Sequence, residues 1–161
     1  MKYLTPQKAK LVANWYFNRH KNIEEKNFAK VHATAVVEIA ILLARKLRLD
    51  VSSIEMAAWV HDIGSTIERD YHAKLSLDLL EQEGFGVSEL IKDCILNHGT
   101  NGKPKSEEAK ILQMADKLSI LSIPMLKLLF KQESITSYDI EFVNKMTTGA
   151  VAYLRELSSN K

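Results

Sequence analysis

Residues 24–47 read EEKNFAKVHATAVVEIAILLARKL, and their apolar side chains recur every three or four positions. This spacing predicts an amphipathic α-helix, because residues three and four apart lie on the same helical face. One face of the predicted helix carries Val36, Ile39 and Leu43, and it should face the protein core. His32 lies on that same face. The stretch therefore predicts a core helix that buries a polar group.

The rest of the chain shows the same helical spacing and lacks the alternating segments that are typical of β-strands. Further helices are predicted over residues 6–19, 53–63, 70–82, 88–97, 106–123 and 137–157. Ser52 or Ser53 should cap the second of these, Gly64 should end it, and Pro124 should limit the helix from residue 106. The sequence predicts an all-α fold of about six to seven helices in one compact domain, residues 1–161.

Length and composition are those of an ordinary globular domain. The chain has 161 residues, of which 46% are hydrophobic and 26% are charged. No apolar run reaches the ~18 residues of a membrane span, and the basic N-terminus lacks the apolar stretch of a secretory signal. The single cysteine, Cys94, cannot form an internal disulfide. We therefore expect a cytoplasmic protein without a membrane partner.

The charge pattern does not resemble that of a dedicated nucleic-acid binder. The formal net charge is +2, and the lysines are scattered along the chain. The densest group of lysines, within residues 103–110, contains no aromatic residue that could stack on a base. The charge pattern therefore argues against nucleic acid as the main partner.

Five of the predicted helices carry a polar, metal-capable side chain on the face that should be buried. These residues are His32, His61, Asp62, His72, His98 and Asp116. One histidine on an apolar face is more often a hydrogen-bonded core residue than a ligand. A buried carboxylate is harder to explain, because it must be paired, protonated or bound to metal. A bound cation would offset the desolvation of the whole set, so the pattern favours a metal site.

Four of these residues, taken in chain order, resemble a known signature. His32, the adjacent pair His61-Asp62, and Asp116 are similar to the H…HD…D signature of the HD superfamily of metal-dependent phosphohydrolases. The string HDIG at residues 61–64 resembles one variety of that signature. The chain is on this basis identified as a small, stand-alone member of the superfamily.

Flanking stretches extend the resemblance over residues 28–123. HAKLSLDLLEQEGF (72–85), ILNHGT (95–100) and EEAKILQMADKL (107–118) are similar to stand-alone bacterial and archaeal members. Some small relatives have a carboxylate shortly after the last metal-binding aspartate, where this chain has Ser119. The chain also lacks the longer signature of members that degrade cyclic dinucleotides, which argues against that activity.

The resemblance implies a site for one or two divalent metal ions. The ligands of the first ion would be His32, His61, Asp62 and Asp116. His72 and His98 would complete a second site with Asp62 as the bridge, or would instead bind phosphate or donate a proton to the leaving group. Imidazole and carboxylate ligands without thiolate suit Mn²⁺, Fe²⁺, Co²⁺, Ni²⁺, Zn²⁺ or Mg²⁺ and do not select among them.

The resemblance further implies a phosphohydrolase that uses metal-activated water to cleave a phosphomonoester or phosphodiester bond of a small, nucleotide-like substrate. Asp62 and His72 would be its catalytic residues. Lys74, Lys103 and Lys117 would contact substrate phosphates, or would be ordinary surface lysines. The alternative is a regulatory HD domain that binds a nucleotide or partner without turnover. Ser119 favours that alternative, and the complete ligand set argues against it.

Overall fold

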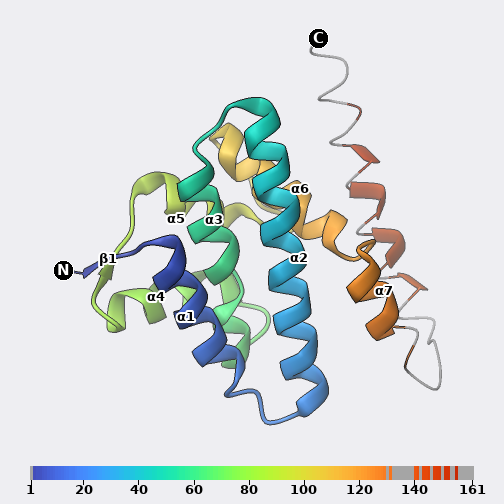
Figure 1. Ribbon diagram of the computed structural model, residues 1–161, viewed down its shortest axis with the longest axis horizontal. Helices are drawn as coiled ribbons and strands as arrows, with labels where there is room; N and C mark the ends of the chain where they lie inside the picture. Colours follow the sequence, from blue (N-terminus) through green and yellow to red (C-terminus); the bar gives the residue numbers. More distant parts are fainter. Residues whose placement is uncertain are drawn as a thin grey trace.

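The computed structural model describes residues 2–129 and 131 and, beyond them, residues 140, 141, 143–145, 147–149, 151, 152 and 155. Within these residues the chain is built almost entirely of helices (Figure 1). The helices are α1 (Pro6–Phe17), α2 (Ile23–Leu47), α3 (Val51–Val60), the 3-10 helix η1 (Ile63–Thr66), α4 (His72–Gln82), α5 (Glu89–Asn97), α6 (Glu107–Ser119) and α7 (Ile123–Leu129). The predicted all-α fold is confirmed. Two short strands, β1 (Lys2–Tyr3) and β2 (Phe85–Gly86), form one parallel pair.

Most of these helices begin at a side chain that accepts a hydrogen bond from a backbone N–H of the first turn. The capping residues are Thr5, Asn22, Asp50, Ser88 and Ser106. The predicted cap of α3, Ser52 or Ser53, is wrong. Asp50 takes that role, because its carboxylate accepts from both the backbone N–H and the hydroxyl of Ser53, at 3.1 and 2.7 Å.

The C-terminal part of the chain differs from the prediction at Pro124. Pro124 does not limit α6, which ends at Ser119; it lies in the first turn of the separate helix α7. Proline fits there because the first turn needs no intrahelical N–H donor. Of the helix predicted over residues 137–157, the structure describes residues 140, 141, 143–145, 147–149, 151, 152 and 155, and these residues are helical.

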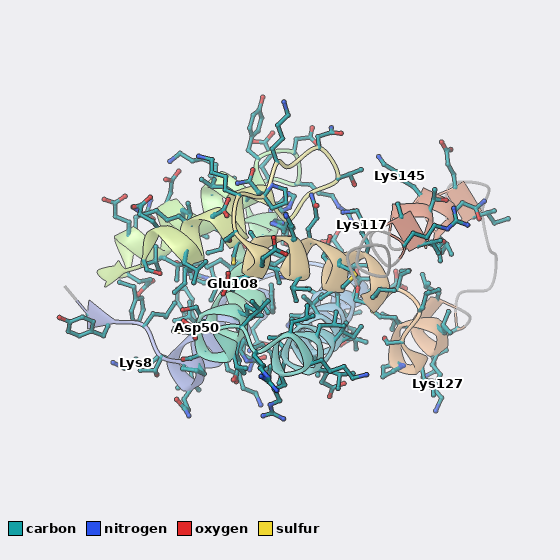
Figure 2. All side chains as sticks on the ribbon, turned by 90° about the horizontal axis from the view of Figure 1, so that it is seen from above. Lys8, Asp50, Glu108, Lys117, Lys127 and Lys145 are labelled. Carbon is teal, nitrogen blue, oxygen red and sulfur yellow. The ribbon has the colours of Figure 1, made fainter. Side chains whose placement is uncertain are left out.

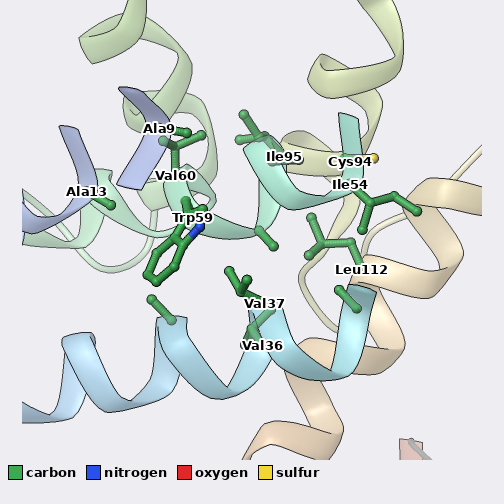
Figure 3. Close-up of a cluster of buried hydrophobic side chains, with 14 of the residues drawn as sticks. Ala9, Ala13, Val36, Val37, Ile54, Trp59, Val60, Cys94, Ile95 and Leu112 are labelled. Carbon is green, nitrogen blue, oxygen red and sulfur yellow. The ribbon is translucent and has the colours of Figure 1, made fainter. Parts of the chain in front are cut away.

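The core forms around α2, the longest described helix (Figure 1). Helices α3 and α6 pack on α2, α1 covers α3, and α5 lies against α3 and α6, while α4 packs on η1 and α5. Figure 3 shows Val36 and Val37 of α2 beside Ile54 and Trp59 of α3, with Leu112 of α6 close by. The apolar face predicted for residues 24–47 thus packs as expected.

Helix α2 is long and apolar enough, by length and composition, to span a membrane, and no other described helix is. Core helices of globular proteins meet the same criterion. In this structure α3 and α6 pack along α2, and its His32 is only 7% exposed. The position of α2 is therefore that of a core helix.

Helices α3 and α6 begin side by side, and their ends also lie close together. The backbone N–H of Asp50 donates to the Glu108 carboxylate at 3.5 Å, and Figure 2 shows these two residues together. At the far end, His61 follows α3 and lies close to Asp116 of α6. The two helices therefore run in the same direction and bring their polar residues to one place.

Candidate metal centre

All six polar residues that the sequence singled out meet in one cluster. They come from five helices: His32 from α2, His61 and Asp62 from the end of α3, His72 from the start of α4, His98 from the end of α5, and Asp116 from α6. Each histidine directs its Nε2 atom into the cluster. The structure thus brings together residues that are widely separated along the chain.

His32, His61 and Asp116 form one half of the cluster. The Nε2 atom of His32 lies 3.3 Å from Nε2 of His61 and 3.1 Å from Oδ1 of Asp116. Nε2 of His61 lies 3.8 Å from the same oxygen. Ligands that share one ion at ~2.0–2.2 Å lie about 3–4 Å from one another, so this spacing suits a single metal ion.

His72, His98 and Asp62 form the other half. The two Nε2 atoms lie 2.9 Å apart, and they are 3.2 and 3.3 Å from Oδ1 of Asp62. The second oxygen of Asp62, Oδ2, lies 3.5 Å from Nε2 of both His32 and His61. One carboxylate therefore faces both halves, one oxygen to each.

The rings of three histidines are oriented by backbone carbonyl groups. The acceptors for Nδ1 are the carbonyl oxygens of Ala58 for His61 (2.8 Å), Arg69 for His72 (2.5 Å) and Ile95 for His98 (2.6 Å). A carbonyl oxygen only accepts, so each Nδ1 carries the proton. In the neutral ring the Nε2 atom that faces the cluster then presents a lone pair.

These observations fit a divalent metal. Nitrogen lone pairs held 2.9 and 3.3 Å apart repel one another unless a cation or a proton lies between them. Two carboxylates add negative charge at the same place. Nitrogen and oxygen donors without sulfur form a donor set that is typical of first-row divalent metals and Mg²⁺. Outward-facing Nδ1–H groups bonded to carbonyl oxygens are likewise typical of metal-binding histidines.

The pKa values of the cluster show how it is charged without metal. Burial lowers the pKa of His61 to about 4. Burial also opposes the charged forms of His32 and His98, but hydrogen bonds to Asp116 and Asp62, respectively, outweigh it and raise both pKa values. The pKa of each carboxylate is lowered because its histidine contacts outweigh burial. Below these raised pKa values, protons on His32 and His98 would occupy positions that cations would take.

The backbone of helix α4 lies very close to Gly64, in the segment that follows His61 and Asp62. Gly64 does not act as the predicted C-terminal cap, because α3 ends at Val60 and Gly64 lies within η1. A Cβ atom at Gly64 would lie 2.2 Å from the carbonyl oxygen of His72 and 2.7 Å from the backbone nitrogen of Ser76. The Ser76 hydroxyl accepts from the Gly64 N–H at 2.9 Å and donates to the His61 carbonyl at 2.8 Å. Glycine here lets α4 bring His72 to the cluster.

Hydrogen bonds of Gln113 and Asp93, two residues that the sequence analysis did not single out, hold the loop after His98. The Gln113 amide, on α6, donates to the carbonyl oxygens of Asn97 and Gly99 at 3.0 and 2.6 Å. Asp93 accepts from the backbone N–H and the hydroxyl of Ser106, both at 2.8 Å. Gln113 lies three residues before Asp116, and this one-turn spacing was the available signal.

Two of the three predicted phosphate-binding lysines lie at the surface. Lys74 is exposed and pairs with Asp78. Lys103 is exposed in the loop after α5, where its backbone N–H donates to the Asn97 side chain at 3.1 Å. Both side chains present a positive charge to solvent near helices that carry metal-site histidines.

Lys117 is placed differently, and its reading as a surface lysine is wrong. The side chain is buried, and a Cβ atom at Gly149 would lie 2.7 Å from its Cδ. Burial lowers its pKa, Asp116 raises it, and Lys145 lowers it. Figure 2 shows Lys117 on the side of α6 toward the segment that carries Lys145.

His20 lies between the charged residues Arg19 and Lys21 and would be expected at the surface, but the structure buries most of its side chain. Its side chain is only 11% exposed, and its Nδ1 lies 3.4 Å from the Glu25 carboxylate. It belongs to the connection between α1 and α2 rather than to the cluster.

The HD-domain family model matches residues 31–121, more than half of the chain and the whole region that supplies the cluster. The chain belongs to the HD-domain family. Its clustered histidines and aspartates are consistent with divalent metal binding in an HD-domain hydrolase fold, and the predicted superfamily is confirmed. A crystal structure of a predicted HD superfamily hydrolase from an uncultured Thermotogales bacterium is similar, with a TM-score of 0.59 and 22% identity. The match covers 93% of this chain and 91% of that one, and it concerns the fold.

Two longer proteins also show sequence similarity to this chain. A deoxyguanosinetriphosphate triphosphohydrolase-like protein of Caldanaerobacter subterraneus subsp. tengcongensis is 32% identical over 110 residues, covering 56% of this chain and 32% of that protein. Ribonuclease Y of Fervidobacterium nodosum is 31% identical over 91 residues, covering 55% and 17%. This HD-domain chain therefore spans a third or less of the length of these relatives.

Proposed function

We propose that this HD-domain protein is a metal-dependent phosphohydrolase that cleaves a phosphomonoester or phosphodiester bond of a small, nucleotide-like substrate. The observation that carries the proposal is the placement of Asp62. Its Oδ2 faces His32 and His61, while its Oδ1 faces His72 and His98. A carboxylate between two histidine pairs is suited to bridge two divalent ions.

The residues divide into two ligand sets that share one carboxylate. The first set is His32, His61, Asp62 and Asp116, and the second is His72, His98 and Asp62. Divalent ions bound there supply acidified water and positive charge for the oxygens of a phosphoryl group. With at most two carboxylates among the ligands, two ions would keep a net positive charge, which attracts an anionic substrate.

The open side of the cluster indicates where substrate would arrive. The side chains of Asp62 and His72 are 25% and 27% exposed, whereas His98 is 3% and His61 is 0% exposed. Substrate would therefore approach past Asp62 and His72, the two residues that we assign to catalysis. Asp62 would orient the attacking water. His72, whose ring is held by the Arg69 carbonyl, would lie beside the leaving group of the substrate.

The names of the relatives support a phosphoester substrate. One is named as a triphosphohydrolase-like protein for a deoxynucleotide, and others as ribonucleases. We favour a small nucleotide over RNA, because the net charge is only +2 and the lysines are scattered. The competing proposal is a regulatory domain that binds a nucleotide without turnover, and the complete set of ligands argues against it.

Metal-dependent phosphate release tests the proposal. Chelated, dialysed protein is assayed with each candidate divalent metal against nucleoside mono- and triphosphates, cyclic nucleotides, short RNA and a generic phosphoester. We expect hydrolysis of a small nucleotide that disappears with chelator and returns with metal. Nucleotide binding without hydrolysis in any metal would support the regulatory alternative, and cleavage of RNA alone would contradict the substrate class.

Metal binding should strengthen as the pH rises. The pKa values of His32 and His98 are raised from 6.5 without metal, so their protons compete with metal for the same Nε2 atoms. A raised pKa stabilises the metal-free fold fully below about pH 6.5, and this contribution is lost as the pH rises through the folded-state pKa. We therefore expect the melting-temperature difference between metal-bound and metal-free protein to widen above about pH 6.5. Thermal unfolding at several pH values measures it, and a difference that narrows over this range would contradict the assignment.

A further inference from the structure

His32 differs from the other three histidines in the group that orients its ring. His61, His72 and His98 each use a carbonyl oxygen three residues earlier in their own segment. The Nδ1 atom of His32 instead lies 3.0 Å from the hydroxyl of Ser119, which comes from α6. Its orienting partner is therefore a side chain on another helix, and it can be changed by mutation.

The position of His32 within α2 explains this difference. His61 and His98 directly follow helices whose last carbonyl groups have no intrahelical donor, and His72 begins a helix. His32 lies in the middle of the 25-residue helix α2, where backbone carbonyls already accept from N–H groups four residues on. A mid-helix histidine must find a partner on another element.

The hydrogen bonds of Ser119 determine which group donates and which accepts in the contact with His32. Its hydroxyl lies 2.7 Å from the carbonyl oxygen of Asp116, one turn earlier in α6. A carbonyl oxygen only accepts, so the single hydroxyl proton is donated there. The Ser119 oxygen is then free to accept from Nδ1–H of His32. That arrangement leaves the His32 Nε2 lone pair pointing into the cluster, as in the other three histidines.

A second group competes for the His32 proton. Oδ1 of Asp116 lies 3.1 Å from His32 Nε2 and, in the absence of metal, would accept a proton held there. A neutral ring protonated at Nε2 cannot bind metal through that atom. Phe28 stacks on His32 with ring centroids 5.8 Å apart, which holds the ring plane but does not choose between the two nitrogens.

We propose that Ser119 is a positioning residue for metal binding: it holds the His32 proton on Nδ1 and so presents Nε2 to a metal shared with Asp116. This inference rests on the proposed metal centre. Because Ser119 and Asp116 lie on one helical turn, the same turn supplies a ligand and orients another. Hydrogen-bond partners of this kind typically change metal affinity by about 10- to 100-fold when they are removed.

Zinc affinity of the full chain, measured by competition with a chelating indicator, tests the proposal. We expect Ser119→Ala to raise the Kd for Zn²⁺ by about 10- to 100-fold and Ser119→Thr, which keeps a hydroxyl, to restore it. Ser53→Ala is the matched control, since Ser53 is also buried and bonded through its hydroxyl, but at the start of α3. Its Kd should equal that of the wild type.

Nuclear magnetic resonance detects the hydrogen bond between His32 and Ser119 in the absence of metal. In metal-free protein labelled with ¹⁵N-histidine, we expect a slowly exchanging Nδ1–H of His32 that Ser119→Ala loses and Ser119→Thr keeps. Its persistence in Ser119→Ala, or an unchanged Kd in that variant, would overturn this inference alone. Failure of the wild type to bind Zn²⁺ would instead overturn the proposed metal centre, so the two failures are distinguishable.

Discussion

Replacing Asp62 with alanine is expected to abolish phosphohydrolase turnover and to weaken metal binding severely. Among the described residues, Asp62 is the one whose carboxylate contacts histidines of both halves of the cluster. Its loss removes a ligand from each proposed ion and leaves the four histidines without a bridging charge. A catalytic metal contributes several kcal/mol to the stabilisation of the transition state, so kcat should fall by about a thousandfold or more.

Two control variants separate this effect from general damage to the fold. His20→Ala changes a partly buried histidine in the connection between α1 and α2, and Asp78→Ala removes an exposed carboxylate that pairs with Lys74. Both should keep wild-type turnover and metal content, which steady-state kinetics and elemental analysis measure. Near-normal turnover in Asp62→Ala would remove the proposed mechanism.

The second large effect concerns the number of metal ions. Replacing His72 or His98 with alanine should lower the metal content of the protein from two ions to one and leave the fold intact. Both histidines face Oδ1 of Asp62, whereas the other oxygen of Asp62, with His32, His61 and Asp116, would still hold the first ion. Elemental analysis of the dialysed variants, with circular dichroism to check folding, measures this change.

A single-ion site predicts a different pattern for the same variants. The wild type would then hold one ion, both variants would keep it, and kcat would fall because a phosphate contact or a proton donor is lost. A wild-type content of one ion, unchanged in His72→Ala and His98→Ala, would therefore refute the two-ion form of the proposal.

The sequence predicted the helices because they depend on local spacing, and it predicted the members of the cluster because each lies on the apolar face of a predicted helix. His32 and Asp116 could be recognised since each interrupts an apolar face at a helical period. The adjacent pair His61-Asp62 gave the family signature, and the family model that matches residues 31–121 bears it out. Helical periodicity determines which face is buried, and that was enough to select the six side chains.

The supporting contacts could not be predicted in the same way, because they depend on how helices pack. Ser119 lies 87 residues from His32, and only the packing of α6 on α2 brings them together. Gly64 reads as a helix terminator in the sequence, yet its function is to admit the backbone of α4. Lys117 follows a ligand and reads as a surface lysine, but it is buried near Gly149. Each of these facts depends on a contact between helices.

We propose that the cluster around Asp62 is a divalent metal centre. The most direct test is calorimetric titration of metal-free wild-type protein with Mn²⁺ and Zn²⁺, with Asp62→Ala titrated in parallel. We expect saturable binding of two ions by the wild type, accompanied by proton release from His32 and His98, and severely weakened binding by Asp62→Ala. Absence of saturable binding by the wild type, or equal binding by the variant, would contradict the claim.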